Sequence, residues 1–134
     1  MTLLDCAASC WWGCAHGDHR IEYLIGRTAN SAYAAIAAAR RGYYAQALSG
    51  ARTLGEIANL LSLFVADAKQ IALWKTIDEK TRRRDFSALK VRLALEKLNA
   101  PIPVNAERYA LLSGYSIHAD PNSIPQAPIP LAGQ

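Results

Sequence analysis

The chain has 134 residues, of which 51% are hydrophobic and 19% are charged, and its formal net charge is +4. This length permits one ordinary hydrophobic core and excludes a second domain of usual size. The apolar residues are largely Ala and Leu, which favours helices over strands. We therefore expect an all-α protein, an antiparallel bundle of about five to six helices over residues 1–120, followed by an irregular Pro-rich tail over residues 121–134.

The first half of the chain predicts a helical hairpin preceded by a short helix. Apolar residues recur with helical spacing, Asp18 can cap the second helix, and Gly42 can end it. Because the connection at Gly42 is tight, the second and third helices should pair antiparallel. The expected ranges are 2–15, 18–41 and 43–66.

The second half predicts shorter helices separated by charged or Pro-containing segments. Ser87 and Asn105 are candidate N-caps, and Pro101 ends the helix before it. The expected helical ranges are 67–77, 87–100 and 106–117, with a charged stretch at 78–85. In the helix after Ser87, four charged residues are expected to be exposed, namely Lys90, Arg92, Glu96 and Lys97.

The sequence predicts neither a membrane span nor a metal site. No segment reaches the ~18 apolar residues of a span, and the start lacks a basic region before a long apolar stretch, so we expect a cytoplasmic protein. Cys6, Cys10 and Cys14, followed by His16 and His19, could in principle bind Zn, although their spacing is unlike that of the paired cysteines of structural zinc sites. We expect reduced thiols in the core and no cofactor.

One helix carries polar residues on its apolar side. Arg52, Glu56 and Asn59 recur at i, i+4 and i+7, in the direction of Leu48 and Leu63. A charge on an apolar face must be paired, hydrogen-bonded or used in function. Two interpretations remain open: the three side chains satisfy one another, or Arg52 holds an anion such as phosphate while Glu56 orients it.

The last helix has a second candidate face. Arg108, Leu111, Tyr115 and His118 follow a spacing typical of a seam that faces a partner helix. His118 would lie at the helix C-terminus near Asp120, where the protonated imidazole is favoured. The alternative is that His118 is a C-cap or a packed side chain.

A short basic run adds a third candidate. It comprises Lys80, Arg82, Arg83 and Arg84, and it is either a solvated helix end or linker, or a set of phosphate contacts. The chain lacks the G-x-G-x-x-G, P-loop, G-x-S-x-G and H-E-x-x-H motifs, which excludes several large enzyme classes.

Two segments resemble a known superfamily. The segment from Arg52 to Glu56, RTLGE, and the stretch from Tyr109 to Pro121, YALLSGYSIHADP, resemble uncharacterised bacterial and phage-associated helical proteins of the HEPN-like kind. The resemblance covers about residues 20–121. It implies an antiparallel bundle, often a homodimer, in a superfamily that contains metal-independent ribonucleases of toxin and defence systems beside inactive RNA-binding or scaffolding members.

Active members of that superfamily carry an Arg followed by four to six residues and then a His. Here nine residues separate Arg108 from His118, which places them roughly 15 Å apart along a helix. We therefore expect catalysis, if present, to use Arg52 and Glu56 with His118 as general acid or base from across the bundle. The expected RNA-binding residues are Asn59, Arg108, Tyr115, Arg82, Arg83 and Arg84.

A function from a different class stays open beside this one. The Ala-rich and aromatic faces would suit a non-catalytic bundle that dimerises or binds a protein partner, with the polar groups only setting the register of the helices.

Overall fold

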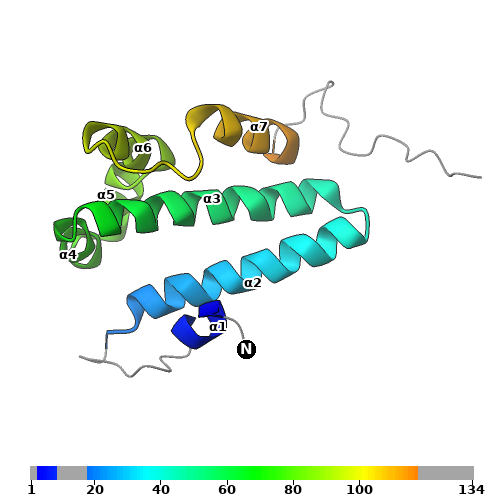
Figure 1. Cartoon of the computed structure of the whole chain (residues 1–134), viewed down its shortest axis with the longest axis horizontal. Helices are drawn as coiled ribbons and strands as arrows, with labels where there is room; N and C mark the ends of the chain where they lie inside the picture. Colours follow the sequence, from blue (N-terminus) through cyan, green and yellow to red (C-terminus); the bar gives the residue numbers. More distant parts are fainter. Residues whose placement is uncertain (1–2, 9–17, 118–134) are drawn as a thin grey trace, which may run out of the picture.

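The computed structural model describes residues 3–8 and 18–117, and these residues form seven α-helices and no strand (Figure 1). The all-α prediction is confirmed. The number of helices exceeds the expected one because the charged stretch 78–85 is itself helical. The helices are α1 (Leu3–Ala8), α2 (Arg20–Arg40), α3 (Tyr44–Ala66), α4 (Lys69–Thr76), α5 (Glu79–Asp85), α6 (Ala88–Lys97) and α7 (Ala106–Ile117).

Helices α2 and α3 form the antiparallel hairpin that the sequence predicts (Figure 1). Gly42, in the connection between them, has φ +81°, a conformation that costs glycine little. The two helices pack closely, since a Cβ atom on Gly50 would lie 2.8 Å from the Cβ atom of Ala35. Small residues on both helices therefore allow their backbones to approach.

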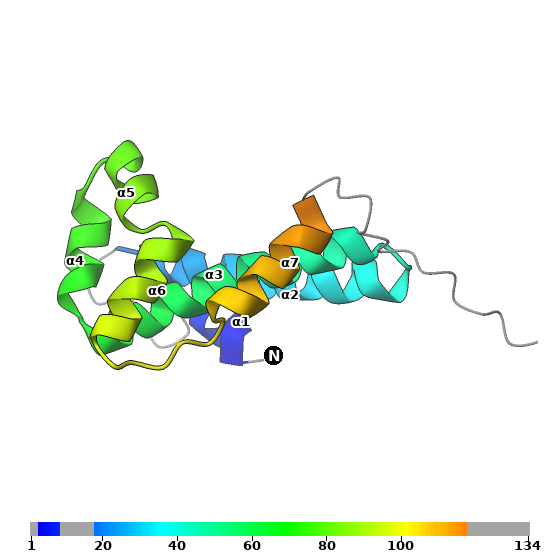
Figure 2. The ribbon, with the colours of Figure 1, turned by 90° about the horizontal axis from the view of Figure 1, so that it is seen from above.

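Helix α3 is the central element of the bundle. Helix α2 lies along one side of it, with α1 beyond α2, and α6 and α7 lie along the other side (Figure 1). Helices α4 and α5 lie at the same end of α3 as α6, whereas α7 extends toward the hairpin connection (Figure 2). The buried core where α3 meets α6 is formed by Leu63, Val91 and Leu95.

Local capping signals set several helix starts. The Asp78 side chain accepts a hydrogen bond from the backbone N–H of Thr81 and so caps α5. Asn105 does the same for α7 through the N–H of Arg108, as predicted. The N-cap position of α2 is His19 rather than Asp18.

The short loop between α6 and α7 is fixed to α3 by a buried amide. The Asn59 side chain is 2% exposed, and its Nδ2 donates to the carbonyl of Val104 at 2.8 Å while its Oδ1 accepts from the N–H of Val104 at 2.9 Å. One turn earlier, Gly55 leaves space for the Val104 side chain. This attachment sets where α7 begins and thus where its side chains meet α3.

Among the described residues, no helix combines the length and the apolar character that a membrane crossing requires.

Candidate functional site

The hydroxyl of Tyr109 joins α3 to α7 at the centre of a polar network. It accepts hydrogen bonds from Nη2 and Nε of Arg52 at 2.7 and 3.1 Å. It donates to Oε1 of Glu56 at 2.7 Å, and the same oxygen lies 3.0 Å from Nη2 of Arg52. We call these three residues, Arg52, Glu56 and Tyr109, the Tyr109 network.

The electrostatics of the network favour the charged form of Arg52. The hydrogen bond to Tyr109, followed by the neighbouring charge of Glu56, raises the pKa of Arg52 above its ordinary value against the opposing effect of burial. The side chains of Arg52 and Glu56 are 28% and 40% exposed, so a ligand from solvent can reach both.

Asn59, the third residue of the predicted stripe, does not take part in this network. Its amide hydrogen-bonds the backbone of Val104 through both oxygen and nitrogen. The prediction that the three side chains pair with one another therefore holds for Arg52 and Glu56. Asn59 instead has a separate structural role.

Arg92 was expected to be exposed, and that prediction is wrong. The residue is only 7% exposed, and its Cζ lies over the Tyr109 ring, 4.7 Å from the ring centroid. A cation over an aromatic face is attracted by the ring. Arg92 belongs to the buried face of α6 because it lies one turn from Ala88 and one turn from Leu95. This helical spacing is visible in the sequence.

Tyr109 is the other central residue that sequence reasoning missed. The sequence singled out Arg108, Leu111 and Tyr115 as the face directed at a partner helix, but all three are exposed, with Leu111 at 55% and Tyr115 at 45%. In the described part of the chain, the face of α7 that meets α3 is rotated by one residue and includes Tyr109 and Leu112. His118 lies outside the described residues.

The basic run is built into α5. Arg82 donates from Nε to the carbonyl of Trp74 at 2.8 Å and from Nη2 to the carbonyl of Ile77 at 2.7 Å, and its guanidinium lies over the Trp74 ring. Arg82 therefore stabilises the C-terminal end of α4. The other two arginines are exposed.

Both of these exposed arginines have acidic partners. Arg83 pairs with Glu79 one turn earlier, and Arg84 pairs with Asp85 at 2.8 Å. Acidic side chains within α5 thus balance much of the positive charge of the basic run. Less exposed positive charge is therefore left without a partner.

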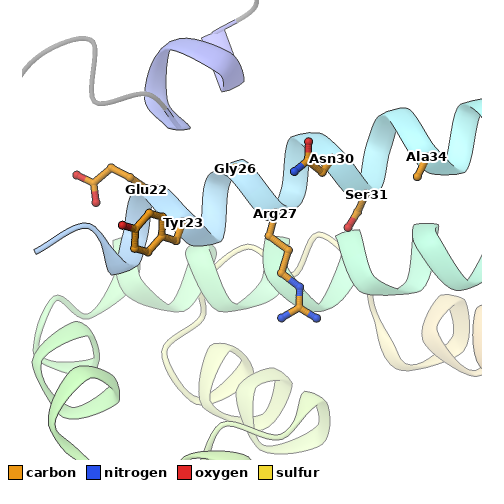
Figure 3. A pocket seen from close by; sticks show the side chains of 7 residues that line it. All are labelled: Glu22, Tyr23, Gly26, Arg27, Asn30, Ser31 and Ala34. Carbon is orange, nitrogen blue, oxygen red and sulfur yellow. The ribbon is translucent and has the colours of Figure 1, made fainter.

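A groove of about 570 Å³ lies along α2 (Figure 3). Every described residue that lines it comes from that one helix, so within the described ranges no second element brings functional groups toward it. The Tyr109 network differs in this respect, because both α3 and α7 contribute its side chains, and Arg92 of α6 lies over the Tyr109 ring. The groove is lined by Glu22, Tyr23, Gly26, Arg27, Asn30, Ser31 and Ala34.

The part of the chain that the structure describes contains no group of three or more His, Cys, Asp or Glu side chains placed to hold a metal ion. Cys6 lies in α1, and Cys10 and Cys14 lie outside the described residues. Comparisons of the chain with protein-family models, with curated proteins and with solved structures found no match. The geometry around Tyr109 is therefore the basis for assigning a function.

Proposed function

We propose that the chain is a helical domain of the HEPN-like kind that binds RNA through the Tyr109 network, in a bacterial or phage-related defence or toxin setting. One observation carries this proposal. The two segments that resemble that superfamily are far apart in sequence, yet Arg52 and Glu56 of the first both hydrogen-bond Tyr109 of the second. RNA binding of this kind requires that the two segments form one shared site.

The chemistry of the network suits a nucleic-acid backbone. Arg52 is a charged fork of N–H donors, and arginine pairs with phosphate oxygens through charge-assisted hydrogen bonds. Tyr109 positions the guanidinium through its hydroxyl, and Glu56 accepts from that hydroxyl and pairs with the same guanidinium. RNA cleavage would in addition need a general acid or base, and His118, directly after α7 in sequence, is the candidate.

RNA binding is tested with the full chain and a fluorescent single-stranded RNA by anisotropy. We expect affinity to fall between about 50 and 200 mM salt, as phosphate contacts require. Arg52→Gln and Tyr109→Phe should each weaken binding roughly tenfold, equivalent to about 1.4 kcal/mol. Arg40→Gln and Tyr33→Phe, at exposed positions of α2, are the matched controls. Salt-independent binding, or equal affinities in all four variants, would contradict the proposal.

Cleavage is tested separately by incubating the RNA with the chain in EDTA. Metal-independent cleavage should persist in EDTA and should be lost in His118→Ala and in Arg52→Ala. If both variants retained wild-type cleavage, neither residue would have a catalytic role. The RNA-binding part of the proposal would then stand without the catalytic part.

A second function, a non-catalytic dimerisation or protein-interaction domain, is favoured by a different observation. Leu111 and Tyr115 are large, exposed and one turn apart on α7. Sedimentation over a range of concentrations would then show a dimer that Leu111→Asp dissociates, together with no affinity for RNA. A monomer at all concentrations would exclude the homodimer.

A further inference from the structure

A cavity of about 140 Å³ lies between α3 and α6 and shares Glu56 with the Tyr109 network. Three segments line it: α3, the first half of α6 and the connection between α5 and α6 (Figure 1). Ile57 and Val91 are only 6% and 3% exposed, whereas the side chain of Glu56 is 40% exposed, so the cavity connects the core with the protein surface. Its lining residues are Glu56, Ile57, Leu60, Phe86, Ala88 and Val91.

The side chains around this cavity are apolar except for one carboxylate. Glu56 is the only lining residue that is not a hydrocarbon, and Phe86 is the only aromatic one. The Phe86 ring packs edge-on against Phe64, with the ring centroids 6.5 Å apart, and this contact restrains the ring. Such surroundings favour a ligand with apolar faces and disfavour an anion such as phosphate, because an anion would lose its hydration beside a carboxylate.

One carboxylate oxygen of Glu56 is available to a ligand. Its Oε1 accepts from the Tyr109 hydroxyl at 2.7 Å and lies 3.0 Å from Nη2 of Arg52. In the described part of the chain, no hydrogen bond uses Oε2 of the same carboxylate. Since each carboxylate oxygen has two acceptor positions, Oε2 can accept from two donors while both contacts of Oε1 persist. An ionised carboxylate only accepts hydrogen bonds, so the ligand must present donors.

We propose that this cavity binds a guanine base of single-stranded RNA, an inference that rests on the proposed function. Proteins that read single-stranded RNA stack bases on aromatic side chains and hydrogen-bond their Watson–Crick edges. Guanine presents two neighbouring donors on that edge, N1–H and the 2-amino group, which match the free acceptor positions of Glu56. Adenine and cytosine present one amino group beside an acceptor nitrogen, which a carboxylate repels. Uracil presents a single N–H between two carbonyl oxygens.

The location of the cavity is consistent with RNA bound at the Tyr109 network. Arg52 is the phosphate contact of the proposed function, and Glu56 lies one turn from it on α3 and pairs with it. An RNA strand with a phosphate on Arg52 therefore has a base close to the cavity. Phosphate contacts position a nucleic acid without reading its sequence, whereas base contacts specify sequence. The cavity thus gives the domain a preference among RNA sequences.

The test measures the affinity of the full chain for three short, uridine-rich single-stranded RNAs by fluorescence anisotropy. The RNAs are identical except at one central position, which carries guanosine, inosine or adenosine. Inosine keeps the N1–H of guanosine and lacks its 2-amino group. We expect the guanosine RNA to bind about tenfold more tightly than the adenosine RNA, as a two-donor contact to one base provides, with the inosine RNA between them.

Glu56→Gln should abolish this preference, because an amide presents a donor as well as an acceptor to the base. Loss of the bond to Tyr109 alone would weaken binding of all three RNAs by the same factor. The ratio of affinities for the guanosine and adenosine RNAs therefore separates a base contact from a structural role of Glu56. Glu96→Gln, at an exposed carboxylate of α6, is the matched control and should keep the ratio. An unchanged ratio in Glu56→Gln overturns the proposal.

Ala88→Leu tests the cavity without altering the carboxylate. Leucine at this half-buried position would fill part of the cavity, so the preference for guanosine should be lost while salt-dependent RNA binding persists. Ala72→Leu, at an exposed position of α4, is the control and should keep the preference. A preference that survives in Ala88→Leu would place the base outside the cavity and overturn the proposal.

Failure of the guanine site and failure of the proposed function give different results. Equal affinities for the three RNAs, with salt-dependent binding of each, overturn the guanine site and leave the proposed function standing. No binding of any RNA overturns the proposed function and the guanine site with it. Arg52→Gln should weaken binding of all three RNAs by the same factor, since a phosphate contact carries no base information. A loss confined to the guanosine RNA would assign base recognition to Arg52 and overturn the role of Glu56.

Discussion

The side-chain amide of Asn59 satisfies both backbone polar groups of Val104, 45 residues further along the chain. The pairing resembles one rung of a β-sheet ladder, made by a side chain in place of a second strand. Because Asn59 is 2% exposed, neither bond competes much with water. The loop before α7 is thereby held at one register on α3, and Tyr109 is brought to Arg52.

Asn59→Ala should be among the most destabilising single changes in the chain. It leaves the N–H and the carbonyl of the half-buried Val104 without partners. Each such group costs about 1–3 kcal/mol when fully buried, and because water partly reaches Val104 we expect a total in the lower part of the summed range, about 2–4 kcal/mol. Urea unfolding measures the difference. The control is Ser62→Ala, whose exposed hydroxyl donates to the carbonyl of Pro101. If Asn59→Ala lowered the free energy of unfolding no more than the control does, the structural role of Asn59 would be contradicted.

Gly55→Ala should destabilise the fold although it improves helix propensity. The added Cβ would lie 2.8 Å from Cγ2 of Val104, a stiff β-branched side chain whose backbone is held by Asn59. We expect overpacking of about 1–3 kcal/mol to exceed the propensity gain of about 1 kcal/mol. Thermal unfolding provides the measurement.

The matched variant for this prediction is Gly114→Ala in α7. Among the described residues, no atom lies within 4 Å of the position that its Cβ would take. It should therefore stabilise the chain by about 0.5–1 kcal/mol. Equal effects of alanine at positions 55 and 114 would show that Val104 does not pack tightly on α3.

Arg82→Met and Arg83→Met should differ although the two residues are adjacent. Arg82 donates to the carbonyls of Trp74 and Ile77, so its loss should cost about 1–3 kcal/mol. Arg83 pairs with Glu79 on an exposed surface, and its loss should change stability by less than about 0.5 kcal/mol. Unfolding in urea distinguishes the two. A stable Arg82→Met variant would indicate that its bonds to the end of α4 contribute little.

Asp18 should make stability depend on pH in the acid range. Hydrogen bonds first from Arg20 and then from Lys75 lower the pKa of Asp18 below its ordinary value of 3.8. The folded chain therefore binds a proton at Asp18 less readily than the unfolded chain. The ionised carboxylate of Asp18 stabilises the fold above pH 3.8, and this stabilisation is lost as the pH falls below 3.8.

The comparison is the melting temperature of Asp18→Asn and of the wild type from pH 7 to pH 2. The gap between them should be widest above pH 5 and should close toward the acid end. Glu96→Gln, at an exposed carboxylate of α6, is the control for the removal of one surface carboxylate. A constant gap for Asp18→Asn at all pH values would mean that the bonds to Arg20 and Lys75 do not act through the charge.

The sequence by itself determined the class of fold and most helix boundaries, because the signals for these are local. Helix α3 ends at Ala66 and α7 starts at Ala106, both as expected, and the signals at Gly42, Pro101 and Asn105 each act within a few residues. The polar pair of Arg52 and Glu56 was also visible, since both residues lie on one helix one turn apart.

Only the tertiary structure decided which residues complete that pair. The face of α7 that meets α3 depends on how Val104 is attached to Asn59, and a rotation of one residue replaces Arg108 by Tyr109. Arg92 was assigned to the solvent because of its charge, yet the aromatic ring that covers it comes from α7, outside the range of any local pattern. Helical periodicity defines faces within one helix, whereas the pairing of faces between helices is set by long-range packing.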